Sequence, residues 1–554
     1  MRVYLFALVF FGLCIPSKAD VKFTDVTDLS GIEFRHFTGA TGNRYMPETM
    51  GAGCAFLDYD ADGNLDILLA NGTSLTSENQ AETPRLYRNI GDGQFIDATE
   101  TAGLDVPMYG MGITAADYDN DADIDIYFTN VGKNYLFRNN GDQTFTDVTD
   151  TADVGDTNWS TSAAFFDADN DGWLDLFVCN YVEWTPETDI PCTVQPTTDN
   201  KRYRTYCTPN VYAGQSCRFY RNRGDGTFND VTTQAGLYNP IGKSLGVALL
   251  DYNRDGWIDL AVANDTEPNF LYRNNGDGTF TDEAILMGVA FSETGKARGS
   301  MGIDTADVDN NGSITIAIGN FSNEKTAFFY AKPGDIYFTD RTDNVQIGNV
   351  SFRLLTFGLL FLDCDLDGAL DLFCVNGHIE PEVLRYQQHT PYAQPPSLFR
   401  NRGDGTFQDI TKNAGLTRTG VGRGCAYGDY DNDGDLDILV QNNGATQDYG
   451  EVWLLRNDSE PPANYLRVRT IGTRSNRDGI GAKIQVKSGN SVQQQMVRTG
   501  SSYCSQSETI LTFGLGNSKT VESLEIQWTS GEIDRYVELK ANQRIEVIEG
   551  ASEK

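Results

Sequence analysis

The chain has 554 residues, a formal net charge of −35, a hydrophobic fraction of 40% and an aromatic fraction of 11%. This apolar content is enough to fill a folded core, so a disordered acidic tail is excluded. The strong negative charge repels nucleic acid and anionic lipid at long range, so neither is an expected partner. The length allows about two to four domains.

The N-terminal segment has the features of a secretory signal peptide. Arg2 precedes an apolar run that ends at Ile15, and Ser17 and Ala19 supply the small residues that favour cleavage. This pattern predicts a signal peptide over residues 1–19. No apolar run is long enough to span a bilayer. The sequence therefore predicts a secreted or periplasmic protein without a membrane span.

Export places the cysteines in an oxidising compartment, where disulfides persist. Nine of the ten cysteines follow the predicted cleavage position, so at least one thiol stays free or pairs between chains. Cys192, Cys207 and Cys217 share one polar stretch, and we expect a Cys192–Cys207 disulfide first. Five further cysteines lie in apolar, strand-like runs and are typical of small buried thiols: Cys54, Cys179, Cys364, Cys374 and Cys425.

The excess acid is confined to one region. Residues 458–462, Asp-Ser-Glu-Pro-Pro, interrupt the pattern and are expected to be a linker. Residues 463–554 carry a net charge of +2 and residues 1–19 another +2, so residues 20–462 carry −39. Short strands alternating with glycine turns predict a compact β domain over residues 463–550.

Two markers recur along residues 20–457. An acidic nonamer of the type DYDADGNLD occurs seven times, beginning at Asp58, Asp117, Asp167, Asp251, Asp307, Asp363 and Asp429. We number these acidic loops one to seven. A Phe-x-Asp segment interleaves with them, also seven times, at Phe23, Phe95, Phe145, Phe228, Phe280, Phe338 and Phe407. A repeat at this spacing indicates one structural unit stacked on the next.

Each unit contains four short apolar segments bounded by Asp, Gly and Asn, which predict four strands. Seven such units predict an all-β, seven-bladed β-propeller over residues 20–457. The seventh unit lacks its outer strand, and an orphan strand at 23–27 is expected to complete it. Insertions lengthen the third unit at 181–215 and the sixth at 376–396.

The acidic loops have the chemistry of a calcium site. Aspartates at positions 1, 3, 5 and 9 repel one another unless a cation lies between them, and position 7 adds a backbone carbonyl. Histidine occurs only three times, so sites that use imidazole are disfavoured. The predicted ligands are Asp58, Asp60, Asp62, Asn64 and Asp66; Asp117, Asp119, Asp121, Asp123 and Asp125; Asp167, Asp169, Asp171, Trp173 and Asp175; Asp251, Asn253, Asp255, Trp257 and Asp259; Asp307, Asp309 and Asn311; Asp363, Asp365, Asp367, Ala369 and Asp371; Asp429, Asp431, Asp433, Asp435 and Asp437.

An EF-hand is excluded because it needs Glu at position 12 and a following helix, whereas these loops continue into strands. Loop two has Ala122 where the turn prefers glycine, and loop four has Asn253 at position 3. Loop five has Thr315 at position 9, and its occupation is left open. We expect about six Ca²⁺ sites, or seven if loop five is filled.

The acidic loops and the Gly-Asp-Gly-x-Phe turns resemble the FG-GAP (VCBS-type) repeats of integrin-α-like propellers. The segments Asn-Arg-Asp-Gly-Ile-Gly-Ala at 476–482 and Gly-Ser-Ser-Tyr-Cys-Ser-Gln at 500–506 resemble the ASPIC/UnbV domain. Together they are similar to the cartilage acidic protein family. The lack of an EGF-like module after this domain resembles bacterial-type members. The resemblance implies an extracellular or periplasmic calcium-binding protein and no defined reaction.

Three functions are compatible with the sequence. The leading hypothesis is a binding or adhesion scaffold for an extracellular protein or glycan, with an unknown oligomeric state. The alternative is a secreted enzyme, a polysaccharide lyase or hydrolase or a phosphoesterase. Its candidate residues are His36, Glu48, His378, Glu380 and Glu382, for which exposed loop positions are the expected environment. A redox or substrate-handling role of a free cysteine is the third.

Overall fold

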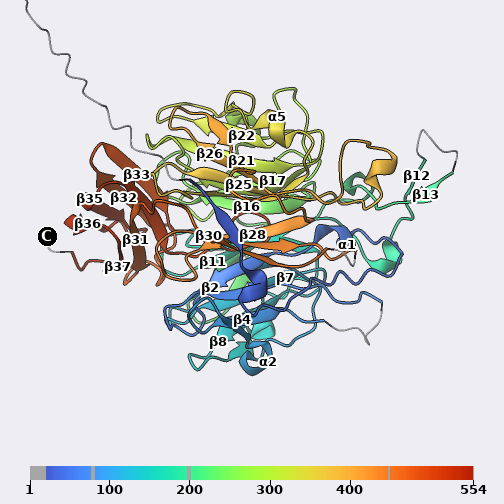
Figure 1. Cartoon of the computed structure of the whole chain (residues 1–554). Helices are drawn as coiled ribbons and strands as arrows, with labels where there is room; N and C mark the ends of the chain where they lie inside the picture. The colour runs from blue at the N-terminus through green and yellow to red at the C-terminus, as the bar shows by residue number, and fades with distance from the viewer. Residues whose placement is uncertain (1–19, 77–81, 196–200, 447–448, 553–554) are drawn as a thin grey trace, which may run out of the picture.

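The computed structural model describes residues 20–76, 82–195, 201–446 and 449–552 (Figure 1). The predicted signal peptide lies outside these residues. The regular secondary structure of the described part is mostly β-strand, and none of its helices is long and apolar enough to cross a bilayer. The helices are η1 (Thr27–Leu29), α1 (Pro47–Met50), α2 (Thr99–Ala102), α3 (Thr149–Ala152), η2 (Pro186–Thr188), η3 (Pro209–Val211), α4 (Ala284–Met287), α5 (Gly348–Ser351) and η4 (Val383–Arg385).

Four-stranded antiparallel sheets follow one another up to residue 457, seven of them within the described ranges. They are β2 (Cys54–Leu57), β3 (Asp66–Leu69), β4 (Arg85–Asn89) and β5 (Phe95–Asp97); β6 (Gly110–Ala116), β7 (Asp125–Asn130), β8 (Tyr135–Asn139) and β9 (Phe145–Asp147); β10 (Ser160–Phe166), β11 (Asp175–Asn180), β14 (Arg218–Asn222) and β15 (Phe228–Asp230); β16 (Ser244–Leu250), β17 (Asp259–Asn264), β18 (Phe270–Asn274) and β19 (Phe280–Asp282); β20 (Ser300–Ala306), β21 (Ile314–Asn320), β22 (Ala327–Ala331) and β23 (Thr339–Asp340); β24 (Thr356–Leu362), β25 (Asp371–Asn376), β26 (Ser397–Asn401) and β27 (Phe407–Asp409); β28 (Gly422–Gly428), β29 (Asp437–Asn442), β30 (Trp453–Asn457) and β1 (Phe23–Asp25).

The orphan strand completes the last sheet, as expected. β1 pairs antiparallel with β30, and Phe23 lies opposite Asn457. This pairing joins the beginning of the repeat region to its end, and the outer edge of β30 is covered.

The first strand of each sheet lies against the first strand of the next. Ser162 Oγ in β10 donates to the Leu245 carbonyl in β16 at 2.7 Å, and Thr305 Oγ1 in β20 donates to the Leu249 carbonyl in β16 at 3.1 Å. β24 contacts β28, and β28 contacts β2. The sheets therefore follow one another around a circle.

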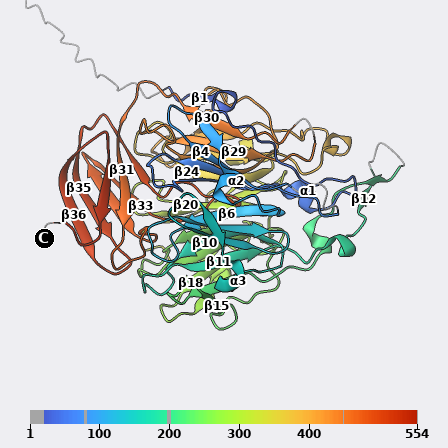
Figure 2. The same ribbon diagram turned by 90° about the horizontal axis from the view of Figure 1, so that it is seen from below.

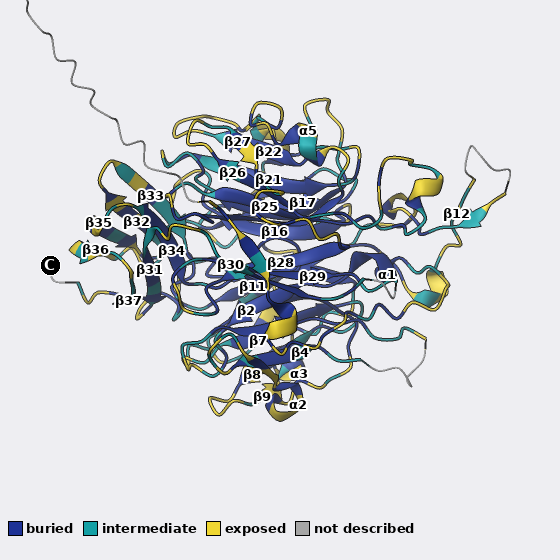
Figure 3. Ribbon diagram, viewed as in Figure 1, coloured by how far each residue is buried: buried dark blue, intermediate teal, exposed yellow. Residues whose placement is uncertain are grey.

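These first strands are buried on both faces (Figure 3). All seven residues of β6, β10 and β24 are buried. These strands are rich in apolar and small residues and do not alternate between apolar and polar ones, because neighbouring sheets cover both faces of each strand.

Strands β31 to β37 form a separate pair of sheets at one end of the molecule, on the left in Figures 1 and 2. The three-stranded sheet contains β34 (Leu511–Gly516), β31 (Asn464–Ile471) and β37 (Gln543–Ile548), and the four-stranded sheet contains β33 (Ser491–Met496), β32 (Lys483–Ser488), β35 (Thr520–Gln527) and β36 (Ile533–Lys540).

One segment of this C-terminal region, residues 500–508, inserts among the first strands of the sheets. We call it the plug. Ser502 exchanges two backbone hydrogen bonds with Ile303 in β20, at 2.9 and 3.0 Å. Gln506 N donates to the Cys54 carbonyl in β2, and its side-chain Oε1 accepts from Thr114 in β6. The plug therefore ties together strands that are far apart in the sequence.

Buried ion pairs reinforce this contact. Arg467 in β31 is 3% exposed and binds both Asp429 and Glu508. Arg498 pairs with the buried Asp304 at 2.6 Å. Because removing one partner of such a pair leaves a buried charge uncompensated, these contacts fix the orientation of the C-terminal region.

The two long insertions lie at the opposite end of the molecule, together with α1 (Figures 1 and 2). The first contains the hairpin of β12 (Thr193–Val194) and β13 (Tyr203–Arg204). A disulfide joins Cys192 to Cys207, the pair that the sequence favours. The other seven cysteines of the described residues are free and buried.

We predict that Gly53→Ala destabilises the whole molecule by at least about 3 kcal/mol. A Cβ at Gly53 would lie 1.6 Å from the Cys504 carbonyl oxygen, so the plug must move. Gly155→Ala is the matched control, since its closest neighbours are the Thr149 methyl at 3.1 Å and the flexible Lys133 side chain. Thermal midpoints measured by calorimetry test this, and equal midpoints for the two variants would contradict it.

Candidate functional site

Every acidic loop joins the first strand of a sheet to the second and is held by the same hydrogen bonds. In loop one, Asp58 accepts the backbone N–H groups of Asp62 and Gly63, both at 3.0 Å. The other six loops repeat this pair of bonds from positions 5 and 6 to the position-1 aspartate. In loop two, Ala122 adopts the positive φ of 81° that glycine has elsewhere, so its backbone is strained but retains the turn.

The position-9 aspartate anchors the loop to the sheet. Asp66 accepts the N–H of Tyr59 at 3.1 Å through one oxygen and the N–H of Asn89 at 2.8 Å through the other. Asn89 is the last residue of the third strand. The equivalent aspartates of loops two, three, four, six and seven accept the same two backbone donors.

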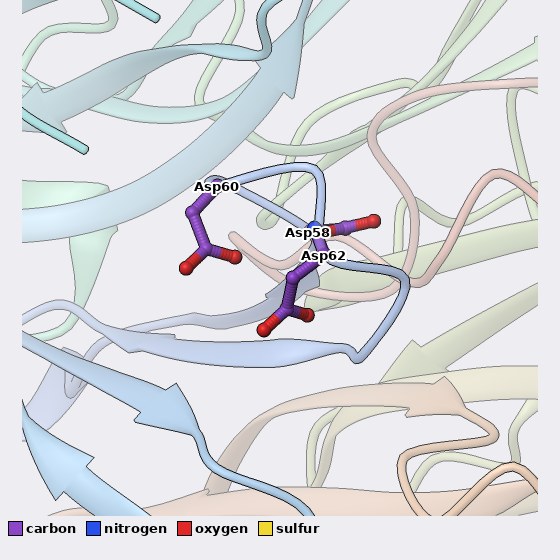
Figure 4. A group of neighbouring side chains, drawn as sticks. All are labelled: Asp58, Asp60 and Asp62. Atoms are coloured by element: carbon purple, nitrogen blue, oxygen red, sulfur yellow. The ribbon is translucent and has the colours of Figure 1, made fainter. Parts of the chain in front are cut away.

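Five loops bring three carboxylates together, with oxygens within 4.8 Å of one another. In loop one these are Asp58, Asp60 and Asp62, which lie on one turn (Figure 4). The others are Asp117, Asp119 and Asp125; Asp167, Asp169 and Asp171; Asp363, Asp365 and Asp371; and Asp429, Asp431 and Asp437. All of these residues belong to the predicted ligand set.

Several of these carboxylates retain a buried oxygen without a protein donor. Among the described residues, Asp60, Asp119 and Asp431, each at position 3, have one such oxygen. An oxygen of this kind loses water without gaining a hydrogen bond, which is costly unless a cation binds it. Clustered oxygen donors are the ligands that a hard divalent cation prefers, so the residues fit calcium.

Burial makes these carboxyls difficult to ionise in the metal-free fold. It raises the pKa of Asp66 and Asp259 to about 8. Burial, followed by the charge of Asp478, raises the pKa of Asp117 to about 8. Neighbouring aspartates of the same loop add to each shift. A bound cation would reverse the effect, because it favours the ionised form.

Loops four and five differ from the other five. In loop four, Lys483 of the C-terminal region pairs with Asp251, and the Asn253 amide donates to Asp255 at 2.7 Å. In loop five, Tyr330 donates to Asp309 at 2.6 Å and Ser313 donates to Asp307 at 3.0 Å. Side chains of the protein thus bind part of these carboxylates, as Arg88 does for Asp60 and Asp62 in loop one.

An asparagine that the sequence analysis did not assign links neighbouring loops. The Asn139 side chain donates to the Ile124 carbonyl in its own loop and to the Tyr59 carbonyl in loop one, at 3.2 and 2.8 Å. The Asn89 side chain makes the corresponding bond to Tyr430 in loop seven at 2.9 Å. The Arg-Asn pair that ends the third strand recurs along the sequence, and this recurrence could have indicated that the asparagine links neighbouring loops.

The structure gathers the candidate catalytic residues near the insertions, and most of them are buried rather than exposed as expected. His36, Glu48, His378 and Glu380 are at most 4% exposed. Arg44 pairs with Glu380 at 2.7 Å and with Glu382 at 3.4 Å. The sequence expectation of exposed loop groups is therefore wrong for these four. Tyr206 of the first insertion donates to Glu48, and His378 and Glu380 belong to the second insertion, whereas His36 accepts the backbone N–H of Gly444.

A fully buried arginine lies between these groups. Arg423 donates to the carbonyls of Thr49, Gly377, Gly422 and His378. Burial, with the Arg423 charge as the second cause, lowers the pKa of His36 to about 3 and of His378 to about 4. Both imidazoles are therefore neutral at physiological pH.

Comparison with protein families identifies both parts of the chain. Residues 58–128, 118–178, 210–262, 251–318 and 363–440 match an FG-GAP-like repeat, and together these matches cover more than half of the chain. Residues 472–554 match the family described as ASPIC and UnbV.

Relatives were found among characterised proteins. Cartilage acidic protein 1 of Homo sapiens is 26% identical over 316 residues, 56% of this chain and 44% of that protein. The Xenopus tropicalis protein of the same name is 27% identical over 319 residues, 56% of this chain and 45% of that protein. The chain thus spans less than half the length of these relatives.

Solved structures resemble the chain more distantly. An Agrocybe aegerita lectin that recognises non-reducing terminal N-acetylglucosamine has a TM-score of 0.37 and 17% identity, and the match covers 74% of this chain and 94% of the lectin. YCF48 bound to D1 peptide has a TM-score of 0.40 and 7% identity, over 77% of this chain and 98% of that one.

We predict that calcium raises the thermal midpoint more at pH 8 than at pH 5. A carboxyl whose folded-state pKa is raised stabilises the metal-free fold at low pH, and this contribution is lost as the pH rises through about 8. Protons therefore compete with calcium for the same oxygens. Calorimetry of calcium-loaded and calcium-stripped samples across this range measures the difference. A calcium effect that is absent, or equal at both pH values, would contradict the prediction.

Proposed function

The chain belongs to the FG-GAP-like repeat family and carries an ASPIC and UnbV domain, and we propose that it is a secreted, calcium-stabilised scaffold that binds an extracellular protein or glycan. In this proposal the seven four-stranded sheets are the blades of one closed propeller over residues 20–457. Residues 458–462 are the linker, and residues 463–550 are the second domain. The N-terminal segment 1–19 directs export.

The observation that carries the proposal is the recurrence of one carboxylate arrangement in five loops. A single cluster of aspartates is common at turns, but a carboxylate trio recurs in five loops. In three of these loops the position-3 aspartate has a buried oxygen without a partner among the described residues. Calcium at each of these loops would remove the repulsion and lock two strands of each blade. At 100 times its dissociation constant, each bound ion stabilises the fold by about 2.7 kcal/mol.

We assign six calcium ions, one for every loop except loop five. Loop four retains three carboxylates, and Asn253 still offers an amide oxygen. In loop five, Thr315 replaces the position-9 aspartate, and Tyr330 and Ser313 donate to the remaining carboxylates. With one carboxylate fewer, and with these hydrogen bonds to the others, loop five has the least need of a cation.

The binding surface in this proposal is the end formed by the insertions. The C-terminal region contacts the acidic loops at the other end, through Lys483 and Arg467. Three large apolar side chains, Ile190, Val211 and Leu384, are exposed on the insertions by 38%, 44% and 56%. Exposed apolar groups on loops held by a rigid ring are typical of a recognition surface.

Binding of the full chain to glycan and extracellular-protein arrays, with calcium and with chelator, tests the scaffold. We expect binding that needs calcium and is weakened at least tenfold by Leu384→Glu. Ile285→Glu is the matched control, because Ile285 is 77% exposed on α4, away from the insertions. Equal binding by both variants would contradict the proposed binding surface.

The number of bound calcium ions tests the calcium assignment separately. If the metal count does not fall by one ion in Asp431→Asn, the assignment is wrong.

The alternative function is a secreted enzyme acting on a polysaccharide or a phosphoester. One observation favours it: Glu48 Oε1 and His378 Nε2 are buried without a hydrogen-bond partner in the described part of the chain. Against it, both oxygens of Glu380 are engaged, one by Arg44 and the other by Thr205 at 2.8 Å. This arrangement suits a structural role that joins the two insertions to the segment before α1.

Turnover assays on polysaccharide and phosphoester panels separate the two functions. Under the scaffold proposal we expect no turnover by the wild type, by His378→Ala or by His389→Ala, whose side chain is exposed. Turnover by the wild type that persists in His389→Ala and disappears in His378→Ala would establish the enzyme instead.

A further inference from the structure

Two of the free cysteines face each other at the base of the first insertion. In the ladder between β11 and β14, Phe177 lies opposite Phe219 and Val178 lies opposite Arg218. One step further along the same register, Cys179 lies opposite Cys217. Directly opposed residues in an antiparallel pair point to the same side of the sheet, so both thiols point to the same face.

The ladder continues beyond this pair into the insertion. Gln215 N donates to the Tyr181 carbonyl at 3.1 Å, and Glu183 N donates to the Ala213 carbonyl at 2.9 Å. Val182 forms a bridge with Gly214. The two ends of the insertion are therefore a regular ribbon, which we call the neck, and its register at Cys179 and Cys217 is fixed from both sides.

The two sulfurs share one buried environment. Cys179 and Cys217 belong to the same apolar cluster and are 0% and 3% exposed. The Cys217 thiol donates to Ser244 Oγ in β16 at 3.2 Å. Directly opposed residues have Cα atoms about 4.5–5.5 Å apart, which lies within the range of about 4.4–6.8 Å that a disulfide requires.

We propose that Cys179 and Cys217 form a second disulfide, which closes the neck of the first insertion. The Cys192–Cys207 bond lies inside the loop that this second bond would close, so the two links are nested. The Cys179–Cys217 bond would constrain the insertion at its base, and the Cys192–Cys207 bond constrains it near its middle. The inference rests on strand register and burial and is independent of calcium and of any ligand.

The Cys179–Cys217 bond would form by thiol–disulfide exchange with an external disulfide, which belongs to a small molecule or to another protein. One S–S bond forms between the two cysteine sulfurs, two protons leave, and the two electrons reduce the external disulfide to two thiols. Because both sulfurs are buried in the folded chain, the reaction takes place during folding, before β16 covers the pair.

Peptide mapping of the wild-type chain tests the proposal without any substitution. The chain is refolded with oxidised and reduced glutathione, denatured, alkylated and digested. We expect a peptide pair linked through Cys179 and Cys217 that separates on reduction. Of the nine cysteines in residues 20–554, five should then be alkylated: Cys54, Cys364, Cys374, Cys425 and Cys504.

Two variants serve as matched controls. Cys217→Ser should release Cys179, so that six thiols are alkylated, whereas Cys374→Ser should keep both links and leave four. Alkylation of seven thiols in the refolded wild type, with Cys192–Cys207 as the only link, would overturn the proposal. A link from Cys179 to Cys504 would also overturn it.

Discussion

Like-charge repulsion within the acidic loops is the constraint on which the rest of the structure depends. Each loop concentrates carboxylates at the point where two strands of a sheet separate, and the fold buries most of those at positions 1 and 9. The backbone supplies part of the compensation through the N–H groups that bind the position-1 and position-9 aspartates. Protein cations supply more of it: Arg88 pairs with Asp60 in loop one, and the C-terminal region contributes Lys483 and Arg467.

This constraint explains why loops four and five differ from the others. Lys483 offsets part of the negative charge of loop four at Asp251, and Tyr330 and Ser313 donate hydrogen bonds to the carboxylates of loop five. The departures from the repeat are therefore consistent with one another. In both loops a protein side chain contacts a carboxylate of the loop, so loss of one aspartate does not have to loosen the sheet.

Local sequence patterns predicted the strands, the acidic loops and the pairing of β1 with β30, because each depends on residues close together in the sequence or on an obvious repeat. They did not predict the plug, since nothing in Ser-Ser-Tyr-Cys-Ser-Gln indicates that it lies among strands hundreds of residues away. The burial of His36 and His378 was also missed. It depends on segments that do not repeat: the second insertion, which contains His378, and the loop at Gly444, which donates to His36.

The plug has a consequence for the order of assembly. It forms hydrogen bonds to strands in the first, second and fifth sheets, including those at Cys54, Thr114 and Ile303, while the last sheet needs β1 from the beginning of the chain. Sheets made early during synthesis therefore expose apolar inner surfaces until residues 500–508 exist. The protein therefore cannot complete its fold while it is still being synthesised. A chaperone that shields these apolar surfaces until residues 500–508 have been made would have this incompletely folded chain as its substrate.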